Sequence, residues 1–202
     1  DGQPYSDGWA PTMCPTPGEP NESCPLLEGC TSLNATNYNA DATIEDGSCV
    51  FGAFSGIVIN EYSAANCDND GSDCGDYEDW IELYNNTSSA IDLGGYYLSD
   101  KVDNIMKWQI PYSLNVEPYS HVIIYASGLN PELEVSANNT NFKLTQTKGT
   151  EFVILSSPEG LVQDYVKLTP HQLNHSVGRN ADYEWRFYTQ PTPGSANDSA
   201  TP

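Results

Sequence analysis

This chain has little positive charge and no long apolar run. Its 202 residues include 7 Lys and Arg against 28 Asp and Glu, giving a formal net charge of -21. Such a charge disfavours sequence-independent attraction to nucleic acid and to anionic membrane surfaces. No apolar stretch approaches the length of a membrane span. The composition therefore argues against nucleic-acid binding and membrane insertion, and it favours a calcium-rich or saline exterior or cationic partners.

The sequence also lacks helical periodicity. Apolar and polar residues alternate over 57–60 and again over 80–84, and the runs end near Asn, Gly, Asp or Pro. This pattern is typical of half-buried strands between turns. Several such strands predict an all-β sandwich or barrel, and residues 52–197 are enough to enclose its core.

The cysteines lack the paired C-x-x-C spacing of a zinc site. Their even count favours disulfide bonds and an oxidising compartment, which predicts an extracellular or cell-surface protein. Pairing between neighbours closes the shortest loops and needs the least chain rearrangement. The predicted bonds are Cys14–Cys24, Cys30–Cys49 and Cys67–Cys74.

Short motifs in a fixed order run through the second part of the chain. The first are IVINEY at 57–62, DWIELYN at 79–85 and DLGGYYLSD at 92–100. The later ones are KWQIP at 107–111, VEPY at 116–119, VIIYA at 122–126, FKLT at 142–145, EFVIL at 151–155, VQDYV at 162–166, SVGR at 176–179, Trp185 and PTPGSAN at 191–197. Together these motifs resemble the lamin tail domain family, in its secreted type.

The resemblance implies an immunoglobulin-like β-sandwich over residues 52–197. Its main departure is an insertion at 66–76, between the first two expected strands, which carries two cysteines. A fold of this kind does not by itself specify a function.

The N-terminal residues 1–28 hold six prolines together with Gly and Ser. This composition prevents regular strand pairing and predicts an extended arm, not a folded domain. Tyr5, Trp9 and Met13 are candidate anchors for assembly with a neighbouring copy. The expected parts of the chain are the arm at 1–28, a Cys-bounded module at 29–51, the sandwich at 52–197 and a tail at 198–202.

The Cys-bounded module resembles a short unit of surface proteins with the form G-C-T, N-Y-N and D-G-S-C. It places oxygen donors at alternating positions, and calcium takes six to eight hard oxygen ligands. The alternative is a disulfide-closed turn in which Asn and Asp act as turn formers. The candidate ligands are Asn37, Asn39, Asp41, the backbone carbonyl of Thr43, and either Glu45 or Asp46.

The insertion offers a second calcium candidate. Asn66, Asp68 and Asp70 alternate and Gly71 follows, as in the first half of an EF-type loop, but Tyr77 stands where the closing Glu belongs. The alternative is a solvated acidic loop.

Seven asparagines stand two residues before Ser or Thr with no Pro between, and each is a candidate for N-glycosylation. They are Asn21, Asn34, Asn85, Asn86, Asn138, Asn174 and Asn197.

Catalytic interpretations are weak. His171 and His175 have helical metal-ligand spacing, but Pro170 and the family resemblance place them in a loop. Glu61 and Glu82 have the residue type of a glycosidase acid and base, yet we expect them to hydrogen-bond within the sandwich. The sequence therefore predicts no enzyme. It predicts a non-enzymatic extracellular structural module, a subunit or repeating segment of a surface assembly or filament. The alternative is a calcium-dependent adhesion or ligand-binding module of a larger secreted protein.

Overall fold

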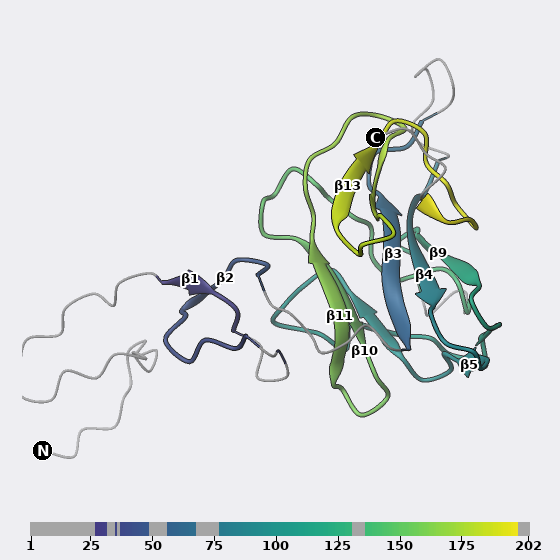
Figure 1. The fold of residues 1–202 in the computed structure, drawn as a ribbon, viewed down its shortest axis with the longest axis horizontal. Helices are drawn as coiled ribbons and strands as arrows, with labels where there is room; N and C mark the ends of the chain where they lie inside the picture. The colour runs from purple at the N-terminus through teal and green to yellow at the C-terminus, as the bar shows by residue number, and fades with distance from the viewer. Residues whose placement is uncertain are drawn as a thin grey trace, which may run out of the picture. The chain divides into compact units, whose positions relative to one another are not determined.

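The computed structural model describes residues 27–31, 35, 37–48, 56–67, 77–130 and 136–197. The chain divides into two compact units, Asp1–Val50 and Phe51–Pro202. The thirteen elements of the described residues are all β-strands (Figure 1), which confirms the all-β prediction. None of the described segments forms a helix that is long and apolar enough to cross a membrane. The predicted arm lies outside the described residues up to position 26 and stays a prediction.

The first unit contains two short parallel strands, β1 (Glu28–Gly29) and β2 (Ile44–Glu45). The Glu45 carboxylate accepts hydrogen bonds from the Thr31 amide at 2.7 Å and the Thr31 hydroxyl at 2.8 Å. Cys30 is buried and disulfide-bonded. These contacts tie the two ends of the 29–48 segment together.

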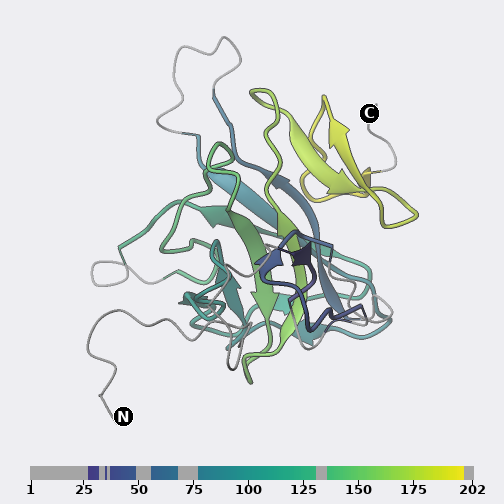
Figure 2. The ribbon, with the colours of Figure 1, turned by 90° about the vertical axis from the view of Figure 1, so that its left-hand side faces the viewer.

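The second unit is built from two larger sheets, whose strands can be followed in Figures 1 and 2. The five-stranded sheet has the order β13-β12-β3-β4-β9, and the four-stranded sheet has the order β11-β10-β6-β7. A two-stranded ribbon pairs β5 with β8. The bounds are β3 (Ile57–Ser63), β4 (Asp79–Asn85), β5 (Ile91–Asp92), β6 (Tyr97–Ser99), β7 (Trp108–Gln109), β8 (Asn115–Val116), β9 (His121–Ala126), β10 (Phe152–Ser156), β11 (Val162–Lys167), β12 (Ser176–Arg179) and β13 (Trp185–Tyr188).

Apolar side chains from both sheets form one core. Ile81 and Leu83 of β4 are fully buried, and they cluster with Leu98 of β6 and Leu155 of β10. Strand alternation places every second residue of β4 in this core and its neighbours on the opposite face of the sheet. Two sheets around one apolar core are consistent with an immunoglobulin-like sandwich.

A β-bulge interrupts the alternation in β3. The pairing of β3 with β4 shifts between Ile59 and Glu61, so that Asn60 is an extra residue in the ladder. Ile59 and Tyr62 belong to the core, while Glu61 lies directly opposite Glu82 of β4. The bulge therefore brings two carboxylates together on the outer face of the sheet.

Candidate functional site

The outer face of β4 and β9 carries three cross-strand pairs of polar and aromatic residues. β4 contributes alternate side chains to this face, and each lies opposite a residue of β9. From one end to the other the pairs are Trp80 with Tyr125, Glu82 with Ile123, and Tyr84 with His121.

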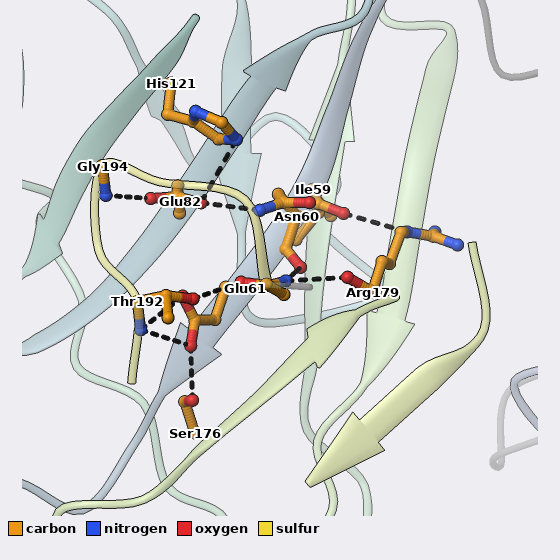
Figure 3. Close-up of polar contacts among 10 residues, drawn as sticks. Ile59, Asn60, Glu61, Glu82, His121, Ser176, Arg179, Thr192 and Gly194 are labelled. Carbon is orange, nitrogen blue, oxygen red and sulfur yellow. Dashed lines mark hydrogen bonds and ion pairs between the residues drawn. The ribbon is translucent and has the colours of Figure 1, made fainter. Parts of the chain in front are cut away.

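A C-terminal strap, residues 191–197, crosses this face and is held by the two carboxylates (Figure 3). The Thr192 amide donates to the Glu61 carboxylate and lies 3.2 Å from Oε1 and 3.3 Å from Oε2. The Gly194 amide donates to Glu82 Oε2, and Asn60 Nδ2 donates to Glu82 Oε1 at 2.7 Å. Glu61 and Glu82 therefore act as acceptors for the backbone of the strap.

Asn197 fixes the end of the strap. Its Nδ2 donates to the carbonyl oxygens of Asn60 at 3.2 Å and Arg179 at 2.9 Å, and its Oδ1 accepts from the Thr192 hydroxyl at 2.6 Å. The approach is close because β12 has a glycine beneath it. A Cβ on Gly178 would lie 2.5 Å from Asn197 Nδ2.

Burial has a large effect on the two carboxylates. Neither side chain is exposed to solvent. Loss of hydration, with a smaller contribution from the neighbouring Glu61, raises the pKa of Glu82 to about 7 against the hydrogen bonds from Asn60 and Gly194. Burial also raises the pKa of Glu61 above its ordinary value, although Ser176 and Thr192 donate hydrogen bonds to it. Glu82 therefore gains or loses its proton near neutral pH.

A buried ion pair links the two sheets beside the strap. Arg179 Nη2 of β12 lies 2.8 Å from Asp164 Oδ1 of β11, and Arg179 Nε donates to the Ile59 carbonyl at 3.0 Å. The second oxygen of Asp164 accepts from the Ile59 amide at 2.8 Å. The Arg179 guanidinium also lies over the Trp185 ring, 4.4 Å from its centroid. These contacts satisfy both charges inside the protein.

The strap leaves a pocket on each side of it. The tyrosine pocket has a volume of about 290 Å³ and lies over the Tyr84 and His121 pair. Its lining is Asn60, Tyr84, Tyr119, His121, Arg179, Asn180, Ala181, Tyr183, Ala196 and Asn197. The Tyr84 and His121 rings stack against each other with their centroids 4.5 Å apart, which makes this part of the lining aromatic.

The tryptophan pocket has a volume of about 530 Å³ and lies over the Trp80 and Tyr125 pair. Its wall is largely apolar, with Pro193 of the strap on one side. The lining is Asn66, Tyr77, Glu78, Trp80, Ile123, Tyr125, Asn139 and Pro193. Two pockets of different polarity therefore share one sheet face.

Comparison with known protein families identifies the family to which the second unit belongs. The model of the lamin tail domain matches residues 52–170. The chain belongs to the lamin tail domain family. A search of curated proteins finds no match. The matched segment of the lamin tail domain ends before β12, yet β12 pairs with β3 and the strap is anchored on β3 and β4. Strand β12 and the strap therefore pack on the matched segment, although they lie beyond it in the sequence.

The first calcium candidate has its side chains engaged in local turns. Asn39 Oδ1 accepts from the Asp41 amide at 3.0 Å, and Asp46 Oδ1 accepts from the Ser48 amide at 2.8 Å. Asn37 Nδ2 donates to the Ser48 carbonyl at 2.6 Å, and Thr43 Oγ1 accepts from the Leu27 amide. The Asn39 and Asp46 contacts are those of a turn-forming role, while the Asn37 and Thr43 contacts join parts of the chain that are farther apart in the sequence. Within the described ranges, no three His, Cys, Asp or Glu side chains form a group that could hold a metal ion. Calcium binding by this loop stays a prediction.

The second calcium candidate is only partly described. Asn66 accepts from the Ser63 hydroxyl at 2.8 Å, and its Nδ2 donates to the Glu78 carbonyl at 3.3 Å. Asp68 and Asp70 lie outside the described residues. Cys67 is buried and disulfide-bonded. Because Cys14, Cys24, Cys49 and Cys74 also lie outside the described residues, the three predicted cysteine pairs stay predictions.

Two of the candidate glycosylation sites are buried in the folded domain. Asn85 has no exposed surface, and its Nδ2 donates to the carbonyls of Ser89, Val116 and Glu117. Asn197 is buried with its Nδ2 inside the strap anchor. A glycan on either nitrogen would break these contacts. Asn86, Asn138 and Asn174 are at least partly exposed, while Asn21 and Asn34 lie outside the described residues.

The histidine pair is not arranged as a metal site. His171 Nε2 accepts from the Ala64 amide at 3.1 Å, and its Nδ1 lies 3.1 Å from the Thr169 carbonyl. One ring nitrogen of His171 therefore contacts the chain just after β3, and the other contacts its own loop.

Sequence reasoning did not find the tyrosine pocket. Its residues come from β3, β4, the turn before β9, the loop after β12 and the strap. The one local signal is Tyr119 after Pro118, at a turn position where glycine is usual.

Proposed function

We propose that this chain is a non-enzymatic extracellular module that binds a partner through the outer face of β4 and β9. The observation that carries this proposal is the pair of pockets on one sheet face, separated by the strap. Binding sites are concave and combine aromatic walls with a few fixed polar groups. The inner face of the five-stranded sheet packs against the other sheet, so of its two faces a ligand can reach the outer one.

The carboxylate geometry supports a non-enzymatic role. An acid and base pair needs access to substrate. Glu61 and Glu82 have no exposed surface, and backbone amides of the strap occupy their oxygens. The lamin tail domain is an immunoglobulin-like family that is not known for enzymatic activity. The disulfide-bonded Cys30 and Cys67 support an extracellular location, because such bonds persist in oxidising compartments.

The partner can be tested on a printed array of glycans and purified extracellular proteins, probed with the full chain. Tyr119→Ala and Tyr125→Ala each remove one aromatic wall, in the tyrosine pocket and the tryptophan pocket respectively. Tyr112→Ala is the matched control, because Tyr112 is 57% exposed and lines neither pocket. We expect at least one pocket variant to lose binding while the control keeps it. A partner that binds both pocket variants as well as the unmodified chain would contradict the proposal.

A structural role in a surface assembly is the second candidate. Strand β13 is an edge strand, and Phe187 on it is 50% exposed. An extended segment of another copy can pair with such an edge, and residues 1–28, with Tyr5, Trp9 and Met13, are the candidate segment. Deletion of residues 1–26 tests this role by light scattering. A smaller particle supports assembly through the arm, and an unchanged one leaves the binding module as the function.

A calcium-dependent form of the binding module is also testable. Calcium held by Asn37, Asn39, Asp41 and Asp46 would stabilise the folded chain by mass action. The thermal midpoint is measured in calcium and in chelator. Equal thermal midpoints in calcium and in chelator would indicate that these Asn and Asp residues only form turns.

A further inference from the structure

We infer that the tyrosine pocket binds one neutral sugar residue of a glycan. This inference rests on the proposed function, because it names the ligand class for one of the two pockets on the outer face. It is carried by three observations on the same ten lining residues: backbone strain, absence of free charge, and size.

Backbone strain is concentrated at this pocket. Tyr119 has φ of 53° and Tyr183 has φ of 61°, a left-handed conformation that bulky residues rarely adopt. Among the described residues the only other non-glycine with positive φ is Asn174, a type that tolerates it. Both strained tyrosines line the same pocket. Strain of this kind gathers at ligand sites, where it holds a side chain in a required position.

Both tyrosines stand in turns, at positions where glycine would be the ordinary residue. The Ser120 amide donates to the Glu117 carbonyl at 3.2 Å, which makes Tyr119 the third residue of a turn that favours glycine there. The Tyr183 amide donates to the Asn180 carbonyl at 2.9 Å in the loop between β12 and β13. Glycine would fit both positions without strain, so the backbone of neither turn calls for a tyrosine. The Tyr183 hydroxyl also accepts a hydrogen bond from Asn86 Nδ2 at 3.4 Å.

The pocket presents polar groups without free charge. Arg179 is its one lining residue that is permanently charged, and the guanidinium is paired with Asp164. Burial lowers the pKa of His121, which keeps the imidazole neutral. Burial, with the nearby Tyr183 and Tyr119, raises the pKa of Tyr84, so its phenol is neutral as well. Hydroxyl, amide and imidazole groups suit a ligand with neutral hydroxyls, and the net charge of -21 repels acidic sugars.

The dimensions and aromatic lining of the pocket fit one ring. A volume of about 290 Å³ is at the low end for small-molecule sites. The aromatic rings of Tyr84 and His121 in the lining suit contact with the C–H groups of a sugar, and the lining also carries hydrogen-bonding groups. Loops and the strap surround the site on separate sides, so it does not continue as the long groove that an extended proline-rich peptide requires.

The test uses saturation-transfer NMR on the full chain with four kinds of probe. These are neutral methyl glycosides of glucose, galactose and N-acetylglucosamine, the anion glucuronate, the cation glucosamine, and an octaproline peptide. We expect a neutral glycoside to give the strongest signal. Tyr119→Gly and Tyr183→Gly should weaken its binding roughly tenfold, because each removes an aromatic wall. Both variants should keep or raise the thermal midpoint, since glycine relieves the strain. Tyr112→Ala should change neither quantity.

The outcomes separate this inference from the proposed function. Binding of octaproline, glucuronate or glucosamine in preference to every neutral glycoside would overturn the sugar assignment. No binding of any probe, with pocket variants still losing an array partner, would overturn the sugar and keep the outer face as the binding surface. A neutral glycoside that binds both glycine variants unchanged would overturn the site. Glycine variants that melt lower would show that the tyrosines serve the fold.

Discussion

The two faces of the five-stranded sheet are held by different physical forces. On the inner face, Ile81 and Leu83 pack into an apolar core shared with the other sheet. On the outer face, Glu61 and Glu82 are as deeply buried, but they are covered by a strap through directional hydrogen bonds. An apolar core tolerates changes of pH, whereas buried carboxylates make stability depend on it. The outer face therefore gives the domain a dependence on pH that its apolar core does not have.

The inner face should show the largest single effect. Leu83→Ala leaves a cavity in a side-chain cluster that has no solvent access, and we expect a loss of about 4 kcal/mol in the free energy of unfolding. Urea unfolding measures it. Leu161→Ala is the control, because Leu161 is 51% exposed and its truncation should cost within roughly 0.5 kcal/mol. Equal costs for the two variants would contradict the assigned core.

The carboxylates of the outer face should make the free energy of unfolding depend on pH. Because the folded pKa of Glu82 is about 7 against an ordinary 4.5, the folded protein keeps a proton that the unfolded chain has already lost. The resulting stability is complete below pH 4.5 and is lost as pH rises through about 7, an effect of roughly 3 kcal/mol. Asp79, with a pKa raised to about 6 by burial, adds in the same direction. Urea midpoints at about pH 5 and about pH 8 measure the difference.

A matched pair of variants tests whether Glu82 causes this pH dependence. Glu82→Gln removes the titrating group but keeps an acceptor for the Gly194 amide, so the difference between the two pH values should shrink. Glu117→Gln removes an exposed charge and should leave the difference in place. If the difference in stability between the two pH values is the same in both variants, a titrating group elsewhere in the protein causes it.

The sequence predicted the positions of the strands better than it predicted which side chains lie on which face of the sheet. Alternation over 57–60 and 80–84 marks β3 and β4, because burial on one face imposes a period of two. The bulge at Asn60 has no comparable signal, and strict alternation from Ile59 would turn Glu61 toward the core. Its position depends on the partner strand, so the carboxylate pair became visible only in the folded domain.

The glycosylation sites and the pocket show the same limit. The sequon pattern reads three neighbouring residues, and it cannot detect that Asn85 and Asn197 are buried by chain segments far away. Tyr84, Tyr119 and Tyr183 are separated in sequence and meet only through the sheet and its loops. Local patterns predict local structure, and this site is not local.

The strap anchor should show an intermediate effect. Asn197→Ala leaves the buried carbonyls of Asn60 and Arg179 without their donor, and it also removes the acceptor of the Thr192 hydroxyl. We expect a loss of about 2 kcal/mol, because unsatisfied buried polar groups cost more than an average hydrogen bond contributes. Hydrogen exchange of the Gly194 amide should also become faster. Protection of that amide at the original level would show that the strap is held without Asn197.

The smallest expected change in the free energy of unfolding comes from the contact between the strap and β12. In Gly178→Ala the new Cβ would lie 2.5 Å from Asn197 Nδ2 and 3.1 Å from Glu61 Cγ, so the strap must shift. We expect a cost of about 1 kcal/mol, below that of a core cavity because the strap lies at the surface of the sheet and can move outward. In an Asn197→Ala background the nearest obstacle is gone, and the same Gly178→Ala change should cost less or become neutral. A double-mutant cycle by urea unfolding measures this coupling. Additive costs would show that Gly178 and Asn197 do not interact, and the strap would then depend on the two carboxylates alone.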